Sequence, residues 1–280
     1  MTGFADGILV GYDGSRCSEQ ALTWAARDAI SRHLPLTVCH AWTTGFTVPR
    51  HKSMVLALAR ECGERVLADG VGRAQELMRS LPVRPLLIEG PAAAVLSQAS
   101  RSADLVVVGS QGRGGVAGQF LGSVSWQVAA CSACPVVVVR GHWRPAAGYR
   151  PGPIVVGADG SAASRAAVGF AFEQAALRDT AVLAVCALAD APGSLAGTRD
   201  LQDEFHLAVD EAEKASPGTA VVRQVAIGGA RAELLRAAQN AQLLVVGSRG
   251  RGGIHGMLLG SVSQALICHA PCPVAVVHPR

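Results

Sequence analysis

Lysine and aromatic residues are scarce in this chain of 280 residues. Lysine occurs only at Lys52 and Lys214, and aromatic side chains make up 4% of the sequence. With so few aromatic residues, the cores must consist of Val, Leu, Ile and Ala, which suit parallel strands buried on both faces. Arg is the main cation, and no block of about five to eight Lys or Arg residues occurs, which argues against nucleic-acid binding.

Long apolar runs and a leader pattern are also missing. No stretch approaches the ~18 apolar residues that span a bilayer, and the N-terminus has neither a basic n-region nor a long h-region. We therefore expect a cytoplasmic protein without membrane insertion. In that compartment its eight cysteines are expected to be reduced thiols.

The composition is that of a folded protein with more than one core. Half of the residues are hydrophobic, 16% are charged, and the formal net charge is +4. A prior of about 150 residues per domain predicts two domains. The low charge and high apolar content exclude a disordered chain.

A glycine-rich motif occurs twice with identical internal spacing. It comprises Gly109, Gly112 and Gly122-Ser123 in the first half and Gly247, Gly250 and Gly260-Ser261 in the second. Each copy follows an apolar run of four residues and precedes an expected helix. A glycine loop between a buried strand and a helix N-terminus can hold a phosphate chain, because backbone N–H groups point at the anion. Arg113 and Arg251 add positive charge within the two loops.

The chain is an internal duplication. Residues 8–15 (ILVGYDGS) match 154–161 (IVVGADGS) at an offset of 146, which becomes 138 at Leu96 and Leu234. The second copy has therefore lost eight residues between its second and third strands, where a surface length change is tolerated.

Each copy alternates expected strands and helices. In the first copy, strands are expected near 7–12, 35–41, 83–88, 104–109 and 135–140, and helices near 17–31, 52–80, 91–102 and 123–132. This alternation predicts an α/β fold in which each domain is an open five-stranded parallel sheet with helices on both faces. The domains are expected at 1–140 and 153–280, joined by a linker at 141–152 that is rich in Gly and Pro.

Serine and aspartate residues next to the loops are candidates for binding. Ser123 and Ser261 stand where a helix N-cap is expected, so each can cap the first turn or donate a hydroxyl to a phosphate. Ser125 and Ser263 could add a second hydroxyl. Asp13 and Asp159 follow the first strand of each copy, where an aspartate can form a turn or face a ligand at the carboxyl edge of the sheet.

Several other chemistries fit less well. The loops are not Walker P-loops, because neither lysine is near them. Cys131 and Cys134 have redox or zinc spacing, but only Cys134 matches a cysteine, Cys272, in the other copy, which favours small core residues. His40 lies opposite Cys186 in the repeat and is interpreted as a packed histidine rather than a base. We expect no catalytic residue and no metal ligand.

These motifs resemble the universal stress protein family in its tandem two-domain, ATP-binding form. The family's pattern of Gly, two residues, Gly, nine residues and Gly-Ser is complete in both halves, and the Asp-Gly-Ser turns and closing Cys-Pro-Val segments match as well. The resemblance implies an adenine nucleotide alpha hydrolase-like fold with strand order 3-2-1-4-5. It also implies pairing through the last strands and a homodimer.

The resemblance also implies the residues that hold ATP, with Mg²⁺ on its phosphates. In the first copy they are Gly11, Asp13, Ala41, Gly109, Gly112, Arg113, Gly122, Ser123, Val124 and Ser125. In the second they are Gly157, Asp159, Ala187, Gly247, Gly250, Arg251, Gly260, Ser261, Val262 and Ser263.

The function implied is that of an ATP-binding regulator in the stress response, which senses adenine nucleotide in both domains and acts through a protein partner. In this interpretation the glycine loops order around the phosphates and change the surface offered to that partner. The rival interpretation is a slow ATP hydrolase or nucleotidyl-transfer enzyme, in which a divalent ion and a positioned water act without a lysine. A scaffold with vestigial sites is disfavoured by two complete motifs.

Overall fold

The computed structural model describes residues 6–44, 53–112, 121–141, 152–188, 195–252 and 258–279. The chain divides into two compact units, Met1–His142 and Trp143–Arg280, called domains 1 and 2 below. Of the expected linker only Gly141 and Gly152 are described, so its role stays a prediction. No helix within the described residues is long and apolar enough to cross a membrane.

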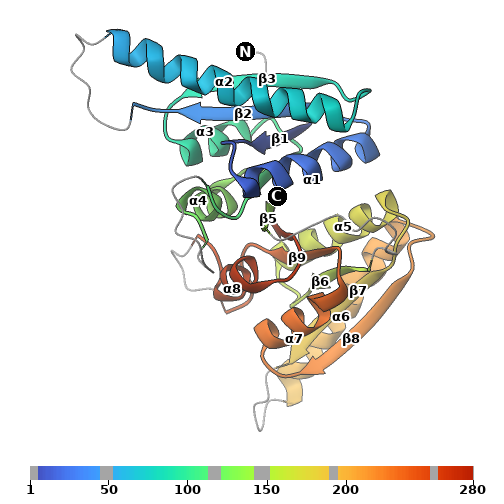
Figure 1. The fold of residues 1–280 in the computed structure, drawn as a ribbon. Helices are drawn as coiled ribbons and strands as arrows, with labels where there is room; N and C mark the ends of the chain where they lie inside the picture. Colours follow the sequence, from blue (N-terminus) through green and yellow to red (C-terminus); the bar gives the residue numbers. More distant parts are fainter. Residues whose placement is uncertain are drawn as a thin grey trace. The chain divides into compact units, whose positions relative to one another are not determined.

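Domain 1 alternates strands and helices (Figure 1). Its elements are β1 (Ile8–Gly11), α1 (Arg16–Arg32), β2 (Leu36–Trp42), α2 (Ser53–Leu77), β3 (Val83–Glu89), α3 (Ala92–Ala99), β4 (Leu105–Gly109), α4 (Ser123–Cys131) and β5 (Val136–Val139). Neighbouring strands pair in parallel in the order β3-β2-β1-β4-β5. The expected α/β fold and the strand order 3-2-1-4-5 are confirmed.

Domain 2 repeats this arrangement. Its elements are β6 (Ile154–Gly157), α5 (Ala162–Leu177), β7 (Val182–Leu188), α6 (Leu195–Ala215), β8 (Val221–Ile227), α7 (Ala230–Ala237), the 3₁₀ turn η1 (Ala238–Asn240), β9 (Leu243–Gly247), α8 (Ser261–His269) and β10 (Val274–Val277). The parallel order is β8-β7-β6-β9-β10. The register repeats as well, because Ile8 pairs with Leu105 in domain 1 and Ile154 with Leu243 in domain 2.

Helices cover both faces of each sheet (Figure 1). In domain 1, α1 and α2 pack together on one face, while α3 and α4 pack together on the other. In domain 2, the corresponding pairs are α5 with α6 and α7 with α8. Central strands such as β1, β4 and β5 are buried on both sides, which explains why they are continuous apolar runs. The edge strands β3 and β8 are partly exposed and include polar residues.

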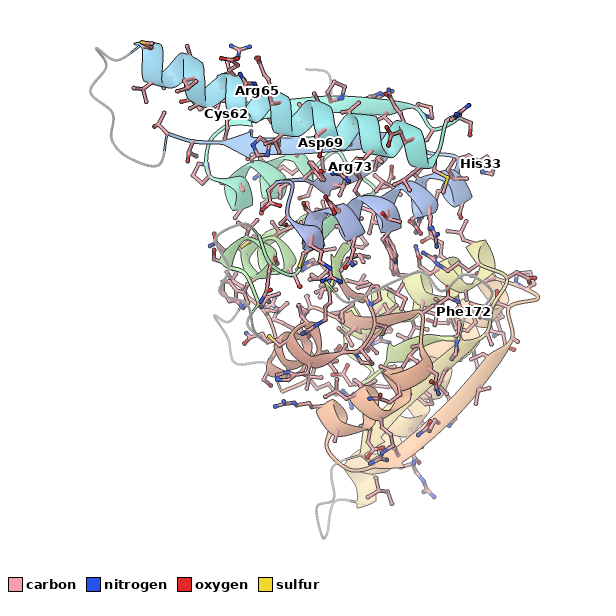
Figure 2. The ribbon with its side chains drawn as sticks, in the orientation of Figure 1. His33, Cys62, Arg65, Asp69, Arg73 and Phe172 are labelled. Carbon is pink, nitrogen blue, oxygen red and sulfur yellow. The ribbon has the colours of Figure 1, made fainter. Side chains whose placement is uncertain are left out.

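The cores consist of small aliphatic side chains, as the composition predicted. All four residues of β5 are buried, as are all four of β10. Aromatic residues contribute at few points, such as Phe172 on α5, which is 1% exposed and is labelled in Figure 2. Short strands of this kind pack closely against helices that carry alanine, and α1 buries Ala21, Ala25 and Ala29 in this way.

Capping residues set the start and end of α1. The Ser15 hydroxyl accepts a hydrogen bond from the Ser18 amide at 3.2 Å, so Ser15 is the N-cap. At the other end His33, labelled in Figure 2, adopts a left-handed conformation with φ 56°. Its N–H reaches the carbonyls of Ala29 and Ile30 and closes the last turn.

Alanine substitutions at two glycines should change the free energy of unfolding in opposite directions. Gly169 lies exposed in the middle of α5, and an added Cβ would meet nothing within 4 Å. Gly169→Ala should therefore raise the free energy of unfolding by about 0.5–1 kcal/mol. Gly7 has φ +85°, and a Cβ there would overlap Pro35. Gly7→Ala should therefore lower the free energy of unfolding by more than about 1–2 kcal/mol. Urea unfolding followed by circular dichroism checks both, and equal signs would contradict this account.

Candidate functional site

Each domain has a cavity at the carboxyl ends of its central strands. Its volume is about 560 Å³ in domain 1 and about 720 Å³ in domain 2. In domain 1 the strand β1 has β2 on one side and β4 on the other. Strands that follow β1 are added first on the β2 side and then on the β4 side, so the direction of strand order reverses between β1 and β4. Ligands of open α/β sheets bind at such a reversal point.

The residues proposed from the sequence gather around these cavities. Arg113 lies outside the described residues. The lining of the domain 1 cavity includes Gly11, Asp13, Ala41, Gly109, Gly112, Gly122, Ser123, Val124 and Ser125. The lining of the domain 2 cavity includes Gly157, Asp159, Ala187, Gly247, Gly250, Arg251, Gly260, Ser261, Val262 and Ser263.

The first glycine of each motif is required by packing. A Cβ on Gly109 would lie 2.6 Å from the backbone carbonyl carbon of Cys17, in the first turn of α1. A Cβ on Gly247 would lie 2.7 Å from the same atom of Ala163 in α5. Glycine at these positions therefore lets the strand end touch a helix backbone, whether or not a ligand is present.

The second glycine of each motif lies against the aspartate of the first turn. A Cβ on Gly112 would lie 2.7 Å from Asp13 Oδ2, and one on Gly250 would overlap the Asp159 carboxylate. In domain 2 the loop also donates to this carboxylate, because the Arg251 amide lies 3.0 Å from Asp159 Oδ2. The aspartate and the glycine loop converge, as the sequence predicted.

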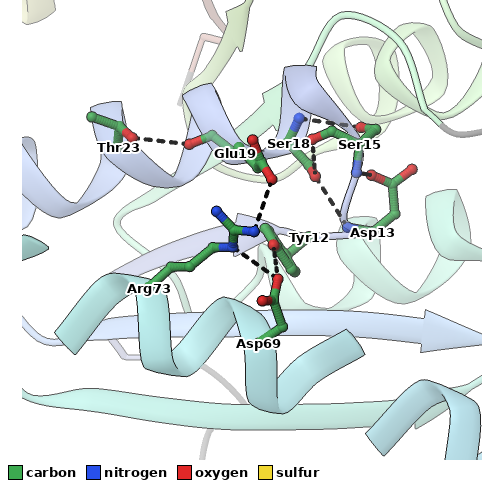
Figure 3. Close-up of polar contacts among 8 residues, drawn as sticks. All are labelled: Tyr12, Asp13, Ser15, Ser18, Glu19, Thr23, Asp69 and Arg73. Atoms are coloured by element: carbon green, nitrogen blue, oxygen red, sulfur yellow. Dashed lines mark hydrogen bonds and ion pairs between the residues drawn. The ribbon is translucent and has the colours of Figure 1, made fainter. Parts of the chain in front are cut away.

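The other carboxylate oxygen of each aspartate holds the turn. Asp13 Oδ1 accepts from the Ser15 amide at 2.9 Å (Figure 3). Asp159 Oδ1 accepts from the Ser161 amide at 3.1 Å and from the Ser161 hydroxyl at 2.6 Å. One carboxylate oxygen of each aspartate therefore forms the turn, and the other faces the glycine loop.

One prediction about the motif serines, that Ser123 and Ser261 are N-caps, is wrong. Ser123 and Ser261 are the first helical residues of α4 and α8, and the N-caps are Gly122 and Gly260. The hydroxyls of Ser125 and Ser263 donate to the carbonyls of Gly109 and Gly247 at 2.6 and 2.8 Å. These two serines thus tie the helix start to the strand end.

The remaining donors at this end of the cavity are the amides of the first helical turn. The N–H groups at the start of a helix have no intrahelical partner. Ser123, Val124 and Ser125 line the cavity at the N-terminus of α4. An N-capping glycine has no side chain to accept these hydrogen bonds, so the first turn of α4 can receive an anion.

The opposite end of the cavity is apolar. Leu96 on α3 lies under Gly11, where an added Cβ would come within 2.9 Å of Leu96 Cδ1. Ala41 and Ala92 complete this wall in domain 1. Leu234 lies under Gly157 in the same way in domain 2. The cavity therefore joins an apolar compartment to a compartment of backbone amides.

Tyr12 lines the domain 1 cavity and is fixed by a charged network (Figure 3). Its hydroxyl donates to Asp69 on α2 at 2.5 Å. Arg73 Nε donates to the same carboxylate at 2.9 Å, and its guanidinium pairs with Glu19 on α1 at 3.3 Å. The ring lies against Gly70, where a Cβ would be 2.6 Å from Tyr12 Cδ1.

This network shifts the pKa values of its members. Burial, followed by the hydrogen bond to Asp69, raises the pKa of the Tyr12 phenol far above its ordinary value. The hydrogen bond from Tyr12 in turn lowers the pKa of Asp69. Tyr12 therefore stays a neutral donor and Asp69 a charged acceptor over the physiological range.

Several residues of the cavity walls were not expected from the sequence. In domain 1 they are Tyr12, Ser18, Cys39, Ala92, Leu96, Val108 and Gln111. In domain 2 they are Ala158, Ser164, Val185, Leu201, Ala230, Leu234, Val246, Arg249, Gly252 and Leu259. Leu96 and Leu234 could have been found from the repeat, because they are related by the same offset as the glycine motifs.

His40 and the cysteines differ in their surroundings. His40 lines the domain 1 cavity, and its Nδ1 lies 2.7 Å from the Tyr12 carbonyl oxygen. A carbonyl oxygen can only accept a hydrogen bond, so Nδ1 carries the proton.

Cys134 and Cys272 are buried, as predicted, and burial raises the pKa of the Cys272 thiol to about 12. Cys131 is exposed. Among the described residues, no group of three or more His, Cys, Asp or Glu side chains could hold a metal ion.

Comparisons with known proteins agree with the sequence motifs. The sequence model of the universal stress protein family matches residues 6–140 and 151–278. A universal stress protein of Mycobacterium tuberculosis is 35% identical and covers 96% of each chain. Another, from Mycolicibacterium smegmatis, is 36% identical over 98% of this chain and 97% of its own. A crystal structure of a universal stress protein from Archaeoglobus fulgidus has a TM-score of 0.75 at 22% identity, with 98% and 96% covered.

The Tyr12 network predicts a pH-dependent contribution to stability. Tyr12→Phe should lower the free energy of unfolding by about 0.5–1.5 kcal/mol at neutral pH. Because the folded-state pKa of Asp69 is lowered, its contribution is present above the unfolded value of about 3.9 and is lost as pH falls through the folded value. The deficit of Asp69→Asn relative to the parent should therefore shrink in acid.

Chemical unfolding of both variants at about pH 6 and about pH 2.5 measures this deficit. Glu64→Gln is the matched control, because Glu64 also lies on α2 but pairs with Arg60 at the exposed surface. The control should show little change at either pH. A deficit of Asp69→Asn that is the same at both pH values would refute the assignment.

Proposed function

Because the chain belongs to the universal stress protein family, we propose that it is a regulatory protein that binds an adenine nucleotide, ATP foremost, in the cavity of each domain. The supporting observation is the repetition of one arrangement. In both domains a glycine loop, an aspartate turn and a helix N-terminus surround a cavity with an apolar end. The two volumes fall within the ~300–1,000 Å³ that is usual for small-molecule sites.

The shape and chemistry of the cavity suggest the orientation of the ligand. The adenine ring fits the apolar end, near Ala41 and Leu96 in domain 1, and Asp13 is within reach of the ribose hydroxyls. The phosphates fit the opposite end, where the amides of the first turn of α4 provide donors for an anion. Among the described lining residues of domain 1, Asp13 is the one that carries a carboxylate. Mg²⁺ would therefore be held mainly by the phosphates and would enter the site together with them.

Sensing rather than turnover is the proposed role. The two lysines of the sequence, Lys52 and Lys214, lie outside both glycine motifs. The side chains of Ser125 and Ser263 serve the fold by donating to backbone carbonyls. Bound phosphates would join the glycine loop to the start of α4, and this joined surface would be what a protein partner recognises.

The proposal includes a cytoplasmic homodimer that acts in the stress response. ATP and reduced thiols coexist in the cytoplasm, and none of the eight cysteines, all of which are among the described residues, forms a disulfide. A dimer would present two pairs of nucleotide sites to the partner. Light scattering of the purified protein with and without ATP measures whether the homodimer forms.

Calorimetric titration of the full chain with ATP tests the binding proposal. We expect two sites per chain and one fewer in each of Gly112→Val and Gly250→Val, because a side chain there displaces the aspartate carboxylate. Each variant should weaken its own site by more than about tenfold, or 1.4 kcal/mol. Gly72→Ala and Gly169→Ala are matched controls, since nothing lies within 4 Å of a Cβ at either position.

The titrations distinguish a failure of ATP binding from binding at another site. Absence of ATP binding to the parent at millimolar concentration would overturn the proposal. Binding that survives in a folded chain carrying both valine substitutions would show that ATP occupies another site. Mass spectrometry of the molecule released by denaturing freshly purified protein provides an independent identification of the ligand.

A further inference from the structure

The domain 2 loop carries an arginine that is held by a carboxylate from another element. Arg251 follows the second motif glycine, and its guanidinium forms an ion pair with Glu204 on α6. The Arg251 side chain is 42% exposed and that of Glu204 is 35% exposed. Since Arg251 also lines the cavity, its positive charge lies at the mouth of the cavity but is already partnered.

Glu204 lies directly over the turn that carries the site aspartate. An added Cβ on Gly160, which follows Asp159, would overlap the Glu204 carboxylate and lie 2.9 Å from Glu204 Cβ. The Arg251 amide meanwhile donates to Asp159 Oδ2 at 3.0 Å. One arginine thus links two carboxylates, through its backbone to Asp159 and through its side chain to Glu204.

The position of domain 1 that corresponds to Glu204 carries no carboxylate. Helices α2 and α6 end at Leu77 and Ala215, and the following strands β3 and β8 start at Val83 and Val221, all at an offset of 138. Buried positions on the two helices match at this offset, which relates Leu67 to Phe205, Gly70 to Ala208 and Ala74 to Ala212. The residue that corresponds to Glu204 is Val66.

We infer that Glu204 is a specificity-determining residue of domain 2 that disfavours ligands with long phosphate chains. This inference rests on the proposed nucleotide site. Glu204 holds the guanidinium that a phosphate would otherwise pair with, and it places a negative charge beside the glycine loop of domain 2. A polyphosphate must displace Glu204 from Arg251 and then lie near the released carboxylate. An uncharged nucleoside meets neither cost.

The two sites of the chain therefore select different ligands. Domain 1, with valine at the corresponding position, favours ATP over adenosine more strongly than domain 2 does. Domain 2 discriminates less between ATP and adenosine or a nucleoside monophosphate. A chain with both sites responds to the ratio of adenylates rather than to ATP alone.

Titrations of the full chain with ATP and with adenosine test the role of Glu204. Gly112→Val serves as the background, so that binding is confined to domain 2. In this background Glu204→Gln keeps the size of the side chain but removes its charge. It should tighten ATP binding by about fivefold or more, the scale of removing one nearby charge in a partly hydrated site. Adenosine affinity should change by less than about twofold.

Arg251→Gln provides the second variant. It removes the cation while leaving Glu204 unpaired beside the phosphates, so ATP binding should weaken and adenosine binding should not. Glu213→Gln is the matched control, because Glu213 lies on the same helix but pairs with Arg223 on β8 at 2.6 Å. It should leave both affinities unchanged, and thermal unfolding verifies that every variant is folded.

Each outcome bears on the inference. A ratio of ATP to adenosine affinity that is the same in Glu204→Gln and its parent overturns the role of Glu204, while binding itself still supports the proposed function. Equal gains for ATP and adenosine overturn it too, since Glu204 would then only restrict entry. If neither ligand binds to the unsubstituted chain, the proposed function fails and this inference fails with it.

Discussion

Burial of both faces of each sheet is the constraint on which the rest of the structure depends. Strands such as β5 and β10 are apolar at every position because a layer of helices covers each side. Polar side chains cannot be accommodated within these strands, and their backbone N–H and C=O groups form hydrogen bonds with the neighbouring parallel strands. Polar chemistry is therefore confined to the carboxyl edge, where the chain leaves β1 and β4, or β6 and β9.

The duplication made the fold and much of the candidate site predictable from the sequence. Two copies with a constant offset of 138 from Leu96 onward fixed which strands and helices correspond, and the order 3-2-1-4-5 followed from the family resemblance. The convergence of Asp13 with the glycine loop was predictable as well, because parallel strands bring their carboxyl ends to one edge.

Contacts between distant residues were not predictable in this way. The Tyr12–Asp69 hydrogen bond joins residues 57 positions apart, and no local pattern encodes it. The N-cap of α4 was misplaced by one residue, because the extended conformation of Gly122, with φ −66° and ψ 149°, makes the glycine the cap. The hydrogen bond from the Ser125 hydroxyl to the Gly109 carbonyl was also not predictable, because these residues become neighbours only in the folded domain.

The contact between Gly109 and α1 has a mechanical consequence. With no side chain between them, the end of β4 meets the backbone of Cys17 directly, so rotamer changes cannot absorb a displacement of either segment. A shift of the end of β4 toward α1 is therefore opposed by contact between the two backbones in the first turn of this helix. The same coupling exists between Gly247 and α5. Each domain thus has one rigid point, at which the strand that precedes the glycine loop lies directly on the backbone of a helix.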